Sequence, residues 1–257
     1  MFIHRLALET AVLSIVFAFA SMVAGQGAGP SPEAVVEVAR LIDEGDVAGL
    51  SRILKTQPAL VKYTGFLLTN SLGWTALHVA VSSAEKNAVE ICSVIIQNGA
   101  NVNAQEGEGN TPLHLAVLRI GREKMLRVPK MSKEAYEGII QLLLDSKANV
   151  RARNSFGVTP LHFAVRFGAD QHTVELLLSA KPDVNAKTAN ADAWTPLHGA
   201  VSTGRVDLLE ILIGHGADLR AKDGHGKTPL DIAEQTANPN PEIIKILRER
   251  TPVKRRD

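Results

Sequence analysis

Thr159-Pro160-Leu161-His162 is one of five copies of a four-residue box that decides how this chain folds. Thr is favoured at the residue that caps the amino end of a helix, and Pro is favoured at the first helical position. The Leu that follows holds the first turn against the interior. Each box therefore predicts the start of an α-helix. The other copies are Thr75-Ala-Leu-His78, Thr111-Pro-Leu-His114, Thr195-Pro-Leu-His198 and Thr228-Pro-Leu-Asp231.

The segments between the boxes follow one pattern, although the Thr residues are 36, 48, 36 and 33 residues apart. Small Ala residues after each box allow neighbouring helices to approach, and Gly121, Gly168 or Gly204 then predicts a left-handed stop. An aliphatic run such as Val174–Leu178 predicts a second helix. One such unit cannot bury its apolar face, so the fold must be stabilised by stacking several units.

These boxes, together with closing segments such as Asn101-Val-Asn-Ala104, resemble the ankyrin repeat over about residues 67–250. The resemblance implies an all-α solenoid of stacked helix-turn-helix units joined by β-hairpin loops. It also implies a protein-binding module that has no catalytic activity and no cofactor. Residues 31–66 predict a degenerate first unit that caps the stack, because Ser31-Pro32-Glu33 is a helix start and Gly45 a helix stop.

Two departures from the repeat pattern stand out. Lys147 and Lys181 replace the Gly that ends the second helix in other units, as Gly99 and Gly216 do, so we expect these lysines to have a positive φ. Residues 122–136 are an insertion that accounts for the spacing of 48 residues. Two elongated helices joined near Val128–Pro129 explain it, and a basic contact loop is the alternative.

Residues 1–29 are interpreted as a signal peptide and linker. The apolar stretch Ala11–Ala24 would rise about 21 Å as a helix, which is less than the roughly 30 Å of a bilayer core. Small residues at Ala18-Phe-Ala20 and Val23-Ala-Gly25 suit a signal peptidase. We therefore expect a secreted or periplasmic protein, and an uncleaved anchor that tethers a scaffold to the membrane is the alternative.

Composition excludes several classes of function. The 28 basic and 27 acidic residues nearly balance, so nucleic acid is not an expected partner. The single Cys92 excludes an intrachain disulfide and lies in an apolar helix, where a buried inert thiol is expected. The four box histidines are expected to tether the helix start rather than to bind metal. Glu106 and Glu108 are expected on a solvated loop, and residues 251–257 form a basic tail.

The resemblance also selects candidate partner-binding residues, because ankyrin proteins generally bind through hairpin tips and first helices. Both tryptophans belong to this set, and packing on a neighbouring hairpin is the alternative role for a tip tryptophan. The expected partner is one other protein, bound by a monomer, and no metal or catalytic residue is expected. The candidates are Leu72, Trp74, Ser82, Ser83, Asn110, Leu118, Arg119, Phe156, Val158, Arg166, Phe167, Trp194, Ser202, Thr203, His225 and Lys227.

Overall fold

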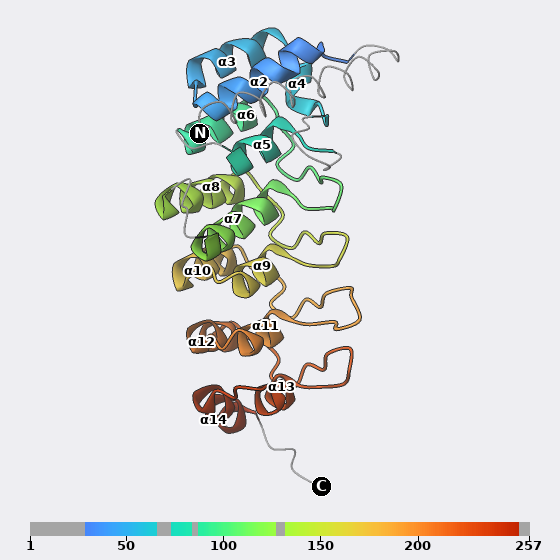
Figure 1. The fold of residues 1–257 in the computed structure, drawn as a ribbon, viewed down its shortest axis with the longest axis vertical. Coiled ribbons are helices and arrows are strands. Elements are labelled where there is room, and N and C mark those ends of the chain that lie inside the picture. Colours follow the sequence, from blue (N-terminus) through green and yellow to red (C-terminus); the bar gives the residue numbers. More distant parts are fainter. Residues whose placement is uncertain (1–28, 66–72, 84–86, 127–131, 252–257) are drawn as a thin grey trace. The chain divides into compact units, whose positions relative to one another are not determined.

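The computed structural model describes residues 29–65, 73–83, 87–126 and 132–251 (Figure 1). The predicted leader up to residue 28, Leu72 and the basic residues Lys254–Arg256 therefore lie outside the described residues. No helix in the described part of the chain is both long enough and apolar enough to cross a membrane.

The described residues form thirteen helices and no strand, which confirms the predicted all-α class. The chain divides into two compact units, Met1–Ala116 with Lys130–Ala148, and Val117–Pro129 with Asn149–Asp257. The helices are α2 (Pro32–Glu44), α3 (Val47–Thr56), α4 (Ala59–Lys62), α5 (Ala76–Ser83), α6 (Ala88–Gln97), α7 (Pro112–Leu126), α8 (Lys133–Asp145), α9 (Pro160–Arg166), α10 (Gln171–Ser179), α11 (Pro196–Ser202), α12 (Val206–Gly214), α13 (Pro229–Gln235) and α14 (Pro241–Arg250).

The first unit begins with a helical pair that lacks the four-residue box. The Ser31 hydroxyl accepts a hydrogen bond from the Ala34 amide, and Gly45 ends α2 with φ 69°. Helix α2 packs against α5, and α3 packs against α6, which in turn contacts α8. The fully buried Ile42 and Leu50 belong to the interior of this pair. The pair thus covers the apolar face of the repeat that follows it.

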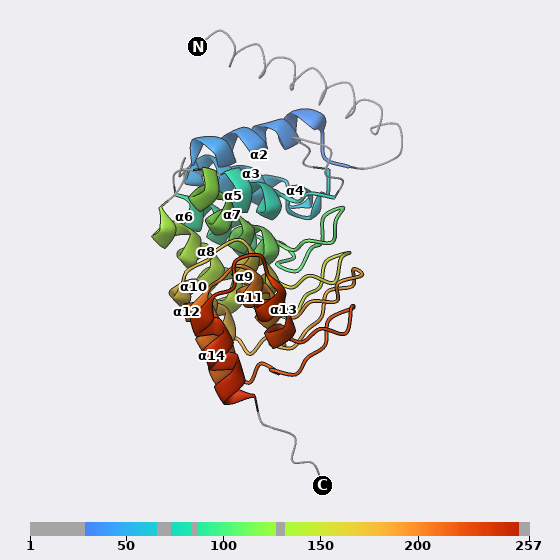
Figure 2. The same ribbon diagram turned by 60° about the horizontal axis from the view of Figure 1, so that its bottom comes forward.

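The second unit is a stack of three repeats. Helices α9, α11 and α13 pack in succession, and α10, α12 and α14 form a second row beside them (Figure 1). The loops that precede α9, α11 and α13 extend from the same side of the stack (Figure 2). Leu161, Leu197 and Leu208 are fully buried in the interior of this unit.

The box works as a reciprocal cap, as Thr159 and His162 show. The Thr159 hydroxyl accepts a hydrogen bond from the His162 amide at 3.4 Å. In return, Nδ1 of His162 accepts a hydrogen bond from the Thr159 amide at 3.2 Å and lies 2.8 Å from the Thr159 hydroxyl oxygen. The same contacts to Nδ1 occur at Thr75, Thr111 and Thr195. The expectation that these histidines tether the helix start is confirmed.

The other ring nitrogen of the box histidine reaches the next repeat. Nε2 of His162 lies 3.0 Å from the carbonyl oxygen of Trp194, and Nε2 of His198 lies 3.3 Å from that of Lys227. In the first unit, Nε2 of His78 makes this contact with Asn110 at 3.2 Å. Because Nδ1 accepts an amide N–H, the proton of the neutral ring is on Nε2, which donates to the carbonyl. One imidazole therefore joins two repeats.

Two lysines do adopt the left-handed backbone that the sequence predicts. Lys147 follows α8 with φ 66°, and Lys181 follows α10 with φ 57°. Gly99 and Gly216 hold the equivalent places after α6 and α12, with φ 93° and 86°. The prediction for Gly121 was wrong, because α7 continues through it to Leu126.

The insertion lengthens the helices on either side of it. Helix α7 has 15 residues, whereas the equivalent α9 has 7. Helix α8 begins at Lys133, where the Ser132 hydroxyl accepts a hydrogen bond from the Ala135 amide. The interpretation as two elongated helices is confirmed up to Leu126 and from Lys133, and residues 127–131 lie outside the described chain.

Replacing either left-handed lysine by glycine should stabilise the fold. Lys181→Gly or Lys147→Gly removes the steric cost of a positive φ, and this gain exceeds the entropy that Gly adds to the unfolded chain. We expect an increase of up to about 1 kcal/mol in the free energy of unfolding, measured by urea titration. Lys222→Gly is the matched control, since Lys222 has no positive φ, and it should lower stability. If Lys147→Gly and Lys181→Gly were both less stable than the parent protein, the positive φ of these lysines would not be a source of strain.

Candidate functional site

The loops that lead into the boxes are hairpins closed by a backbone hydrogen bond. No strand is assigned to them among the described residues, so each hairpin depends on a few specific contacts. The closing bonds run from Glu106 N to Asn110 O at 3.0 Å, Asn154 N to Val158 O at 3.0 Å, Thr188 N to Trp194 O at 2.9 Å and Asp223 N to Lys227 O at 2.8 Å.

One side chain in each of three hairpins holds the tip together. Oδ1 of Asp223 accepts the amides of His225 and Lys227, each at 2.8 Å. Asn154 makes the equivalent pair of bonds, each at 3.0 Å. Glu106 does the same for Glu108 and Asn110, each at 3.1 Å. All three residues stand five positions before the Thr of a box, so this recurrence in the sequence is a signal for the residue that holds the tip.

The expectation for Glu106 was therefore wrong. Its side chain is buried, with 7% exposed, because its carboxylate oxygens are occupied by amide donors of its own hairpin. Asn110 is a second correction. It is only 4% exposed, and its side-chain amide donates to Glu106 Oε1 at 2.7 Å, so it supports the hairpin and is not accessible to a partner.

The three hairpin tips of the second unit lie against one another. The Ala189 amide donates to the Phe156 carbonyl at 2.7 Å, and the Gly224 amide donates to the Asp192 carbonyl at 2.6 Å. A Cβ atom on Gly224 would lie 1.7 Å from the carbonyl oxygen of Ala191, so only glycine fits there. The tips therefore form one continuous surface across three repeats.

The candidate residues differ in how accessible they are. Phe156 is 55% exposed at the tip of the first of these hairpins. Arg166, Ser202, Thr203, His225 and Lys227 are also exposed. Leu72 lies outside the described residues, as does the side chain of Ser83. The candidates of intermediate exposure are Trp74, Ser82, Leu118, Arg119, Val158, Phe167 and Trp194.

The aromatic candidates have partners that restrict them. The Phe167 ring packs edge-on against Phe163, with ring centroids 5.5 Å apart. Trp194 is held through its backbone, whose amide donates to the Thr188 hydroxyl at 2.9 Å. In the first unit, the Trp74 ring lies 6.1 Å from the His78 ring. Phe156 is thus the aromatic candidate whose side chain is most available.

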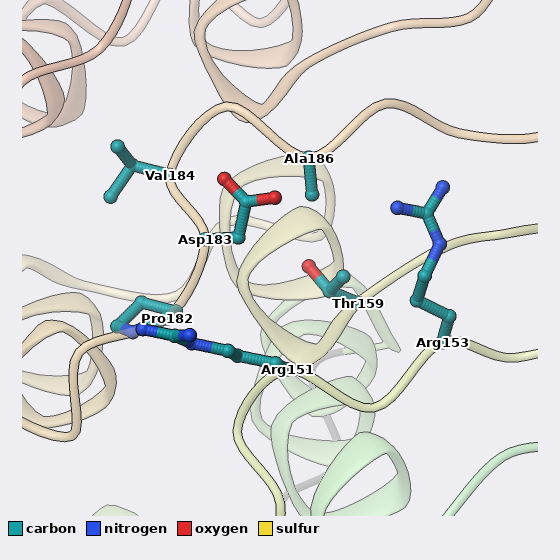
Figure 3. A pocket seen from close by; sticks show the side chains of 7 residues that line it. All are labelled: Arg151, Arg153, Thr159, Pro182, Asp183, Val184 and Ala186. Carbon is teal, nitrogen blue, oxygen red and sulfur yellow. The ribbon is translucent and has the colours of Figure 1, made fainter.

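The described residues offer little for catalysis. The Cys92 thiol is fully buried, and burial raises its pKa to about 12, so it is neutral and inert at physiological pH. No cluster of three metal-ligating side chains occurs in the described part of the chain. An open pocket of about 360 Å³ lies between two consecutive repeats, and its lining includes Arg151, Arg153 and Asp183 (Figure 3).

Comparison with known proteins places the repeats in a family. The sequence profile described as "Ankyrin repeats (3 copies)" matches residues 45–128, 131–223 and 172–257. These matches cover most of the chain.

Individual relatives are similar over shorter stretches. The 2-5A-dependent ribonuclease of Mus musculus is 45% identical over 60 residues, which are 23% of this chain and 8% of that protein. The ankyrin repeat-containing protein P1E11.10 of Schizosaccharomyces pombe is 36% identical over 67 residues, 26% of this chain and 32% of that protein. Rabankyrin-5 of Mus musculus is 29% identical over 175 residues, 61% of this chain and 15% of that protein. The chain thus spans less than a third of each of these relatives.

Proposed function

Because the chain belongs to the ankyrin-repeat family, whose fold serves protein–protein interaction, we propose that it binds another protein through the hairpin tips and first helices of its second unit. It has no catalytic role in this proposal, because the family fold is generally non-catalytic. The ribonuclease match covers only 60 residues and gives no reason to assign nuclease activity to this chain.

One observation supports this surface above others. Phe156 is the large hydrophobic residue that stays exposed among the described residues, and it lies at a hairpin tip bonded to the next tip. Exposed aromatic side chains on a rigid support are typical anchors of protein interfaces. Phe167 and Trp194 are partly exposed in the same unit, so a partner that covers Phe156 has further aromatic surface within the same stack.

The proposal includes a place of action. The short apolar stretch at residues 11–24 and its small-residue cleavage sites support secretion to the periplasm or the exterior, followed by action as a soluble monomer. The alternative is a scaffold tethered to the membrane by an uncleaved first segment.

Truncation of the exposed aromatic should weaken partner binding without harming the fold. Phe156→Ala removes an interface anchor, and loss of a central anchor costs about 2 kcal/mol or more, roughly thirtyfold in affinity. Trp194→Ala should act in the same direction. The measurement is the dissociation constant for a partner isolated with the parent protein, together with thermal melts followed by circular dichroism.

Neutralising the tail residues Lys254, Arg255 and Arg256 is the control, and it should change the affinity only slightly. Loss of binding in the tail variant with full binding by Phe156→Ala would overturn the proposed surface. Unfolding of Trp194→Ala would assign that residue a packing role, and Phe156→Ala would then decide the question alone.

Processing of the chain gives a separate test of the place of action. The mature protein should begin near Ser21 or Gln26 and be released in the soluble extracytoplasmic fraction. Amino-terminal sequencing after cell fractionation measures this. Recovery of chains that begin with Met1 in a washed membrane pellet would favour the tethered alternative.

A further inference from the structure

We propose that a row of basic side chains beside the hairpin tips of the second unit is a docking site for an acidic, extended peptide segment. The row consists of Arg153, Lys187 and Lys222, one residue at the same place in each of three successive repeats. Each directly follows an Ala, at Ala152, Ala186 and Ala221. Gln105 holds this place in the first unit, so the row belongs to the second unit.

Side-chain contacts show that the row is continuous. The Arg153 guanidinium donates to the carbonyl oxygen of Lys187, 34 residues away. The Lys187 ammonium group donates to the carbonyl oxygen of Lys222 at 2.7 Å, 35 residues away. Each of these two cations thus reaches the residue at the same place in the next repeat. All three residues are exposed.

These contacts hold the cations in place without neutralising them. A carbonyl oxygen carries no net charge, and a lysine ammonium has three donors, of which Lys187 uses one in this bond. Long side chains usually lose rotamer entropy when they bind a charged partner. Because Lys187 is already fixed, part of that entropic cost is met in the folded protein, which favours binding.

The carboxylates near the row are engaged in a turn and a helix cap. Asp183 accepts the Asn185 amide at 3.0 Å. Asp231, whose charge interacts with Lys222, accepts the amide and the hydroxyl of Thr228 at 2.8 and 2.7 Å. Asp183 also lines the pocket beside the row, together with Arg151 and Arg153 (Figure 3). These fixed negative charges oppose a continuous polyphosphate, whereas a peptide can place uncharged residues next to them. The row therefore fits an acidic peptide better than a nucleic acid.

The repeat spacing sets the pattern of the peptide. Packed helices lie about 8–10 Å apart, and an extended chain in the polyproline II conformation rises about 3.1 Å per residue with three residues per turn, so every third side chain lies on the same face. Three residues therefore span one repeat, and a carboxylate at every third position can meet each cation of the row in turn. An extended segment with Glu or Asp at every third residue is the expected ligand.

Fluorescence anisotropy with a labelled peptide of four Glu-Ser-Gly units tests this site at low ionic strength. The parent protein should bind this peptide and not its Gln-Ser-Gly counterpart. The double variant Lys187→Gln/Lys222→Gln should bind about tenfold more weakly, since it removes two of the three ion pairs that the peptide can make with the row. Added salt should weaken binding by the parent.

The charge-matched control is Lys55→Gln/Lys245→Gln, which removes two exposed lysines from helices α3 and α14 and should bind like the parent. Equal binding of the Glu and Gln peptides, equal affinities of the two double variants, or no binding by the parent would overturn the proposal. Tighter binding of a single-stranded oligonucleotide through the same two lysines would overturn it in favour of nucleic acid. Two controls exclude unfolding as the cause of weaker binding by Lys187→Gln/Lys222→Gln. This variant should melt at the same temperature as the parent, and Lys187→Arg/Lys222→Arg should bind the peptide like the parent.

Discussion

The structure depends on neutral box imidazoles that make hydrogen bonds in two directions, as those of His78, His162 and His198 do. Nδ1 of His162 accepts from its own helix cap, and Nε2 donates to the loop of the following repeat. Because the helices of a repeat are short, an isolated unit would be only marginally stable. The imidazole links the start of one helix to the position of the next hairpin. Asp231 in the last box makes the cap hydrogen bonds, but its carboxylate has no N–H group that could donate to a following hairpin.

The accessible surface follows from that link. The carbonyls that receive the imidazole protons belong to Trp194 and Lys227, the residues directly before the next box. The hairpin that ends at Lys227 is therefore fixed at its base by His198 of the preceding repeat and at its tip by the Asp223 side chain. The side chains that these bonds leave exposed, such as Phe156, are presented on a rigid support. Rigid presentation lowers the entropic cost of binding.

Local chemistry explains which features could be predicted from the sequence. The caps, the buried box histidines and the left-handed turns at Lys147 and Lys181 each depend on residues close together in the sequence. The position of Gly121 inside α7 depends on the insertion that follows it, and the pattern of the other repeats gave no sign of this. Burial of Glu106 was missed because charge alone suggested a solvated loop, whereas two amide donors satisfy it. The basic row recurs at one sequence position, after Ala152, Ala186 and Ala221, but the hydrogen bonds that join its members depend on the tertiary structure.

The central claim is that the stack requires neutral imidazoles, and protonation is the cleanest way to perturb them. Burial lowers the pKa of His78 and His198, and it lowers that of His162 to about 4. The unfolded chain, with an ordinary histidine pKa near 6.5, binds more protons below that pH, so stability must fall as the pH drops from about 6.5 toward 4. The most direct measurement is the free energy of unfolding at pH 7.5 and pH 5. His162 alone should account for a loss of about 2 kcal/mol at pH 5, and equal stability at the two pH values would contradict the account.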